Sequence, residues 1–179
     1  MRKRLFRWEL GGFFWTAAAG TLLHFVYGWS GGSAAAAVFA AVNESVWEHM
    51  KLLVMPAFLF TALQVWVLGE IYPNIPAVRA ITIPFGALLI PVLYYTYTGA
   101  LGLQAAWMNI VIFFLSAAVM FWLDYRLLRT GLPAFGWAQL LGVALLWGLV
   151  FVFVWCTFRP PELPLWQDPV SGTYGAAVR

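Results

Sequence analysis

Residues 45–71 read SVWEHMKLLVMPAFLFTALQVWVLGEI, a long apolar run that opens on a group of ionisable side chains. An α-helix needs roughly 20 apolar residues to cross the hydrocarbon core of a bilayer. Four further segments, residues 6–28, 77–99, 103–128 and 134–157, are also long and apolar, and short stretches rich in Gly, Pro and Ser separate them. The sequence therefore predicts an all-α integral membrane protein built as a bundle of five transmembrane helices.

Composition leads to the same fold class. Of the 179 residues, 63% are hydrophobic and only 9% are charged, and the mean hydropathy is +0.83. A soluble domain carries about 25% charged residues and about 45–50% apolar ones, so this chain cannot cover itself with a solvated surface. We expect a multi-pass protein of the cell membrane with the lipid bilayer as its main partner. The sequence contains no module typical of nucleic-acid binding.

The distribution of Lys and Arg predicts the orientation. With the N-terminus inside, the cytoplasmic side carries seven of these residues and the opposite side three. The seven are Arg2, Lys3, Arg4, Arg7, Arg79, Arg126 and Arg129, and the three are Lys51, Arg159 and Arg179. Because cytoplasmic loops carry the excess of positive charge, we expect the N-terminus inside and the C-terminal tail outside.

Two segments lie outside the predicted spans. Residues 159–179 contain four prolines and cannot continue a helix, so we expect an extended extracytoplasmic tail that could act as a lid on the transmembrane domain, residues 1–158. A disordered terminus is the alternative. The alanine-rich run between the first two spans is too short to cross a membrane and favours a short re-entrant or interfacial helix.

The densest group of polar residues is at the start of the second span. Glu44, Glu48 and Lys51 have the spacing i, i+4 and i+7, which places them on one face of a helix, while His49 points about 100° away from Glu48. The other histidine, His24, lies at a comparable depth in the first span, about 7 Å below its outer end at 1.5 Å per residue. We therefore expect a polar pocket in the outer leaflet formed by these two spans.

A stripe of small residues supports this pairing of the first two spans. Counting back from His24 in steps of four gives Gly20, Thr16 and Gly12. Small residues at this spacing let membrane helices approach closely. His24 is therefore expected to face protein rather than lipid.

The favoured function is the binding or passage of a small ion, a proton or a polar ligand at this pocket. Glu44 and Glu48 would carry charge or protons, and His24 and His49 would relay protons or act as ligands. Lys51 would tune the carboxylates or hold an anion. Three residues near the pocket are further candidates for ligand binding: Asn43, Arg159 and Asp168.

A metal-dependent hydrolase is the first alternative. Imidazole and carboxylate groups bind zinc and non-haem iron, so His24, His49 and Glu48 could hold one such ion. Glu44 would then act as general base on a lipid-borne ester or amide. The HExxH spacing of many zinc hydrolases is absent, and adjacent residues such as Glu48 and His49 can share an ion only where the helix start is irregular.

A structural or partner-binding subunit is the second alternative. Ser45 and Glu48 have the spacing of a capping box, and Asn43 is itself a good cap. Lys51 would pair with Glu44 or Glu48, and the small-residue stripe would be an interface. Association of identical copies is compatible with this interpretation.

The remaining polar residues favour simpler roles. Glu9 and Asp124 lie near the predicted inner ends of spans, where we expect them to be solvated. The three tyrosines Tyr94, Tyr95 and Tyr97 are typical of an interfacial aromatic belt. Cys156 is the single cysteine, which excludes an intramolecular disulfide.

Two separated motifs carry a resemblance to a known family. They are VNESVWEHMK at residues 42–51 and PPELPLWQDPVSGTYG at residues 160–175. Together they resemble a family of small, uncharacterised bacterial membrane proteins, and the resemblance covers nearly the whole chain. It implies a polytopic inner-membrane protein and transfers no activity to any residue.

Overall fold

The computed structural model describes residues 2–103, 105–131, 133 and 135–176. Six α-helices lie within these ranges, with no strand beyond a single bridge between Gln167 and Tyr174. They are α1 (Arg2–Trp29), α2 (Ala34–Phe39), α3 (Val46–Leu68), α4 (Ile75–Leu101), α5 (Ala106–Leu128) and α6 (Gly136–Phe158). The all-α class is confirmed, and α2 is the short helix predicted in the alanine-rich run.

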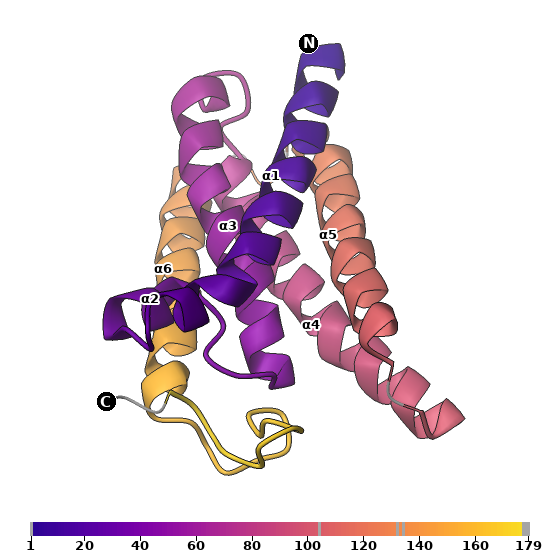
Figure 1. Ribbon diagram of the computed structural model, residues 1–179. Helices are drawn as coiled ribbons and strands as arrows, with labels where there is room; N and C mark the ends of the chain where they lie inside the picture. The colour runs from indigo at the N-terminus through magenta and orange to yellow at the C-terminus, as the bar shows by residue number, and fades with distance from the viewer. Residues whose placement is uncertain (1, 104, 132, 134, 177–179) are drawn as a thin grey trace.

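Five of these helices are long and run alternately in opposite directions, so that the N-terminus and the C-terminal tail lie at opposite ends of the bundle (Figure 1). The end at which α3 begins and α6 finishes is called the tail end below. α3 packs against α1 and α4, while α4 also packs against α5 and α6. α1 closes the arrangement by contacting α5.

Four of the helices, α3 to α6, are long and apolar enough to cross a membrane. α1 is as long as the others, but basic residues occupy its first turns and Gly, Thr and His interrupt its apolar stretch. The predicted span at α1 is therefore less apolar than the other four. This composition of helices is compatible with a membrane protein.

The core is centred on α3, most of whose side chains are buried. The small-residue stripe of α1 faces this core: Gly12, Thr16 and Gly20 are all buried. A Cβ on Gly12 would collide with the rings of Phe60 and Phe121. The prediction of a close helix approach at this stripe is confirmed, and it brings α1 against both α3 and α5.

Three charged residues expected at the membrane edge are instead buried in the bundle. Arg79 and Asp124 are fully buried, and Glu9 is 3% exposed. The expectation of solvation is wrong because each side chain lies on the core-facing side of its helix, and Arg79 is not a loop charge. Lys51, which we counted on the opposite side, is buried as well.

Candidate functional site

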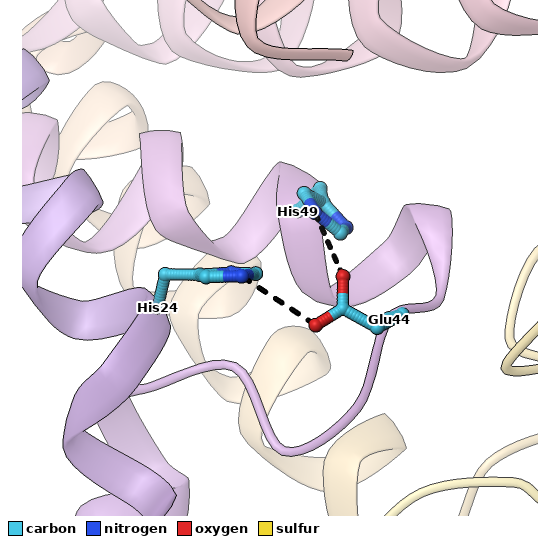
Figure 2. A group of neighbouring side chains, drawn as sticks. All are labelled: His24, Glu44 and His49. Atoms are coloured by element: carbon cyan, nitrogen blue, oxygen red, sulfur yellow. Dashed lines mark ion pairs between the residues drawn. The ribbon is translucent and has the colours of Figure 1, made fainter. Parts of the chain in front are cut away.

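Both histidines meet one carboxylate at the tail end of the bundle. His24 comes from α1, Glu44 from the loop before α3, and His49 from the first turn of α3 (Figure 2). His24 Nε2 lies 3.4 Å from Glu44 Oε1, and His49 Nε2 lies 3.7 Å from Glu44 Oε2. One donor atom from each residue lies within 4.8 Å of the others. These three side chains are called the His–Glu–His group below.

The start of α3 fixes the orientation of His49. Ser45 is the N-cap, and its Oγ accepts a hydrogen bond from the backbone N–H of Glu48 at 3.3 Å. The side chain of Asn43 accepts from the N–H of Ser45 at 2.9 Å. One turn later, His49 Nδ1 lies 2.9 Å from the carbonyl oxygen of Ser45. Because a carbonyl can only accept, Nδ1 is the donor of this hydrogen bond, and Nε2 is left facing Glu44.

His24 is positioned by the close contact between α1 and α3. One turn before it, a Cβ on Gly20 would stand 2.6 Å from the carbonyl oxygen of Leu52 and 2.6 Å from the ring of Phe113. Only glycine permits this spacing. The contact places the His24 ring 5.4 Å from the His49 ring, measured between centroids.

Two cavities meet at the His–Glu–His group. Five residues line both of them, namely Glu44, His49, Ala106, Asn109 and Phe113. The tail cavity, of about 270 Å³, extends toward Tyr94 of α4 and toward Val170 of the C-terminal tail. The α1–α5 cavity, of about 340 Å³, extends between Thr21 and Phe25 of α1 and Ile110 of α5.

Asn109 is the main further polar side chain at this junction. Its Oδ1 accepts a hydrogen bond from the hydroxyl of Tyr97 at 2.9 Å. The same hydroxyl accepts from the N–H of Ala105 at 3.4 Å. Tyr97 therefore ties the last turns of α4 to the start of α5, beside the two cavities.

Glu48, predicted as a metal ligand together with His24 and His49, lies in a different group. Its Oε2 is 2.6 Å from Lys51 Nζ, and both side chains are buried. Thr157 of α6 donates to Glu48 Oε1 at 2.9 Å, and Lys51 donates to Thr157 Oγ1 at 2.8 Å and to the carbonyl of Ala37 at 2.9 Å. Adjacent residues on a helix point about 100° apart, so Glu48 faces α6 while His49 faces α1.

This buried ion pair also changes the predicted capping box. Ser45 accepts from Glu48 N as expected, but the Glu48 carboxylate accepts from the N–H of Val42 at 3.1 Å rather than from that of Ser45. Lys51 pairs with Glu48 and joins α3 to α2 and α6. The ion pair of Lys51 and Glu48 therefore fixes α2 and α3, the two helices that flank the loop containing Glu44.

The C-terminal tail packs over the tail end of the bundle. The N–H of Trp47 donates to the carbonyl of Leu165 at 3.0 Å, and the rings of Trp47 and Trp166 lie 4.8 Å apart. Farther along, the N–H of Ala176 donates to the carbonyl of Thr157 at 2.9 Å. Residues 159–176 are thus tied to both α3 and α6.

The three residues predicted to bind a ligand, Asn43, Arg159 and Asp168, make contacts with the tail or with the last turn of α6. Asn43 donates to the carbonyl of Gly175 at 3.3 Å. Asp168 accepts from the N–H of Val170 at 2.8 Å and from the hydroxyl of Ser171 at 2.7 Å, which forms a tight turn. Arg159 lies over the ring of Trp155. Asp168 nonetheless shapes the site, because the turn it organises carries Pro169 and Val170 into the wall of the tail cavity.

Sequence reasoning missed a second buried ionic network, at the other end of the bundle. Arg79 Nη2 donates to Glu9 Oε2 at 3.0 Å and to Gln64 Oε1 at 2.7 Å, and Arg79 Nη1 donates to Asp124. Gln64 donates to Glu9 Oε1 at 2.6 Å, and Thr82 donates to Asp124. The network links α1, α3, α4 and α5. A signal was present: Glu9 precedes Gly12 by three residues and so shares the face of the small-residue stripe.

The chain belongs to DUF6512, a family of unknown function, which matches residues 2–176. The expected membership of an uncharacterised family covering nearly the whole chain is thereby confirmed. No curated protein matches the chain, and no solved structure does.

Proposed function

We propose that this chain is a five-span membrane protein that binds one divalent transition-metal ion at the His–Glu–His group. The placement in a membrane rests on α3 to α6, which are long and apolar enough to cross one. Large apolar side chains such as Phe14, Trp66 and Leu140 point outward along the helices, where lipid would cover them. α1 supplies the fifth span, with its basic start inside and the tail end of the bundle in the outer leaflet.

The observation that carries the metal proposal is the spacing of the three donor groups. Zinc binds nitrogen and oxygen ligands at about 2.0–2.1 Å, so two ligands of a tetrahedral ion lie about 3.3 Å apart. The distances of 3.4 and 3.7 Å from the Glu44 oxygens to the histidine Nε2 atoms are close to this value. Small side-chain adjustments would therefore complete the site.

The surroundings of His49 support the same proposal. A metal-binding histidine nearly always donates its second ring N–H to a carboxylate, a carbonyl or a water, which fixes the tautomer and turns the free nitrogen toward the ion. His49 has this arrangement through the carbonyl of Ser45. Two imidazoles and one carboxylate form a ligand set that binds both zinc and non-haem iron.

Metal analysis of the full-length protein, purified in detergent and loaded with zinc, tests the proposal. We expect about one zinc per chain, and none in the His24→Ala/His49→Ala double variant. Thr21→Val is the matched control, because Thr21 lies in the same cavity wall one turn from His24 and its hydroxyl bonds to the carbonyl of Ala17 rather than to the group. The same metal content in the double variant as in the wild type would exclude the site.

A metal-free wild type after loading would also exclude this function. Glu44 would then act as an ion-pair partner of the two histidines, and the favoured alternative would become a proton or ion relay. A purely structural role predicts a different result from metal binding. Removal of a structural ion pair lowers the unfolding temperature and leaves the metal content unchanged. Metal content therefore decides between the metal site and these two metal-free alternatives.

Hydrolysis of a lipid-borne ester or amide is the second candidate function. The observation in its favour is that two cavities meet at the three side chains that would hold the ion, and an ion with three protein ligands would keep a position for water. Zinc-bound water ionises near neutral pH and can attack a carbonyl carbon. Vesicles of phosphatidylethanolamine and phosphatidylglycerol incubated with the zinc-loaded protein would release fatty acid, and His49→Ala would abolish the release.

A further inference from the structure

The α1–α5 cavity and the tail cavity share one junction and extend from it in different directions. Beyond the shared residues, the α1–α5 cavity is lined by Phe25, Leu52, Ile110 and Phe114 together with Gly20, Thr21 and His24. The tail cavity adds the apolar residues Val46, Ile90, Ala105 and Ile112, the hydroxyl-bearing Tyr94, and Pro169 and Val170 of the tail. A molecule that fills both would have one part between α1 and α5, a second part under the tail at the end of the bundle, and a link at the His–Glu–His group.

The apolar cavity opens toward the outside of the bundle. Phe25, Ile110 and Phe114 stand at its mouth and are 49%, 58% and 38% exposed, whereas Leu52 and Phe113 in its inner wall are 3% and 9% exposed. The exposed residues continue the apolar outer surface of α1 and α5. In a bilayer this mouth would face hydrocarbon, because the exposed side chains around it are apolar and continue the apolar outer surface of the bundle.

The part of the cavity lined by Phe25, Leu52, Ile110 and Phe114 is a poor place for water. A buried water needs two to four polar partners, and most of this lining offers carbon atoms alone. Its volume of about 340 Å³ lies at the lower end of the range of roughly 300–1,000 Å³ that ligand pockets span. A hydrocarbon chain from the surrounding lipid fits both the apolar lining of the cavity and the outward position of its mouth.

We propose that the two cavities receive one acyl lipid. Its hydrocarbon chain lies in the α1–α5 cavity, its carbonyl oxygen faces the His–Glu–His group, and its headgroup lies in the tail cavity under Val170. The position proposed for the carbonyl oxygen depends on the proposed metal function, because a bound ion would attract that oxygen as a Lewis acid. The position proposed for the hydrocarbon chain depends only on the shape and lining of the α1–α5 cavity.

Photo-crosslinking tests this proposal. The full-length, zinc-loaded protein is reconstituted into vesicles of phosphatidylethanolamine and phosphatidylglycerol, part of which carries a diazirine in the acyl chain near the carbonyl. Surrounding lipid can reach outward-facing residues such as Leu115, which is 47% exposed. A lipid inside the cavity should in addition label the buried residues Leu52 and Phe113.

A pair of neighbouring variants on α5 supplies the control. Ile110→Trp narrows the mouth and should reduce labelling of Leu52 and Phe113 at least fivefold. Val111→Trp introduces the same side chain at a residue that is also exposed but does not line the cavity, and should leave the labelling unchanged. Labelling confined to outward-facing residues, or an equal loss in both variants, would overturn the proposal.

Metal content measured on the same samples separates the two proposals. Zinc without labelling of the inner wall would refute the lipid and leave the metal site standing. Labelling of the inner wall without zinc would refute the metal and retain the hydrocarbon chain in its cavity. Ile110→Trp should keep its zinc, because the substitution lies outside the three ligands.

Discussion

Lys51 Nζ lies 2.6 Å from Glu48 Oε2, and the two side chains are 0% and 2% exposed. Removing one member of such a pair leaves the other as an unpaired buried charge, which costs about 3–5 kcal/mol. We therefore expect Lys51→Met to lower the unfolding temperature in detergent sharply. The double variant Glu48→Gln/Lys51→Met should recover much of the loss, because no charge remains unpaired.

Zinc content separates this pair from the metal site. Since Glu48 faces α6 and Thr157 rather than the two histidines, the folded double variant should bind zinc as the wild type does. A double variant that is folded but metal-free would contradict the assignment of Glu44 as the carboxylate ligand.

Arg79 should be irreplaceable by lysine. Its guanidinium donates from Nη1 to Asp124, from Nη2 to both Glu9 and Gln64, and from Nε to Gln64, and a lysine ammonium cannot reproduce this fork. We expect Arg79→Lys to destabilise the protein by about 2–5 kcal/mol, the range for broken buried charge pairs. Thr82→Val, which removes one hydrogen bond to Asp124 and keeps the guanidinium, should cost about 1–3 kcal/mol. Equal unfolding temperatures for Arg79→Lys and the wild type would refute this role.

The two ionic networks show how far the sequence could predict this molecule. Apolar runs of span length predict the long helices, because the need to cover a helix in lipid sets its composition. The spacing of His24 and His49 from the ends of their spans placed them at one depth. Glu44, rather than Glu48, completes the His–Glu–His group because of the path of the loop before α3 and the position of α6. Helical periodicity encodes neither of these. Glu9 and Asp124 were misjudged because nearness to a helix end was given more weight than the face on which they lie.

The contact of Gly20 with α3 should control metal affinity. A methyl group there meets the backbone oxygen of Leu52, which cannot turn aside, so Gly20→Ala should push α1 away from α3 and cost about 1–3 kcal/mol. Because His24 follows one turn later, its ring would move relative to His49 and zinc affinity should fall at least tenfold. Titration with a zinc-competing chelator measures the change. Gly28→Ala is the control, since a Cβ at Gly28 meets nothing within 4 Å.

Acid should release the metal from the His–Glu–His group. A protonated imidazole has no lone pair to donate, so protons compete with zinc for Nε2 of His24 and His49. Zinc retained after desalting should therefore be highest at neutral pH and should decline as the pH falls toward about 5. Retention that stays constant over this interval would mean that the ion is held by other residues.

The turn organised by Asp168 should keep the tail over the tail cavity. Asp168→Ala removes the acceptor for the Val170 N–H and the Ser171 hydroxyl, so the turn at residues 169–172 loses its two bonds to this carboxylate and keeps its backbone hydrogen bonds. We expect a protease added to the reconstituted protein to cut this segment at least threefold faster, with little change in unfolding temperature, because the bundle is intact. Glu162→Ala is the control, as it removes an exposed carboxylate from the same tail. Cleavage at wild-type rates in Asp168→Ala would show that the ring contact between Trp166 and Trp47 and the hydrogen bond from Trp47 to Leu165 hold the tail without this turn.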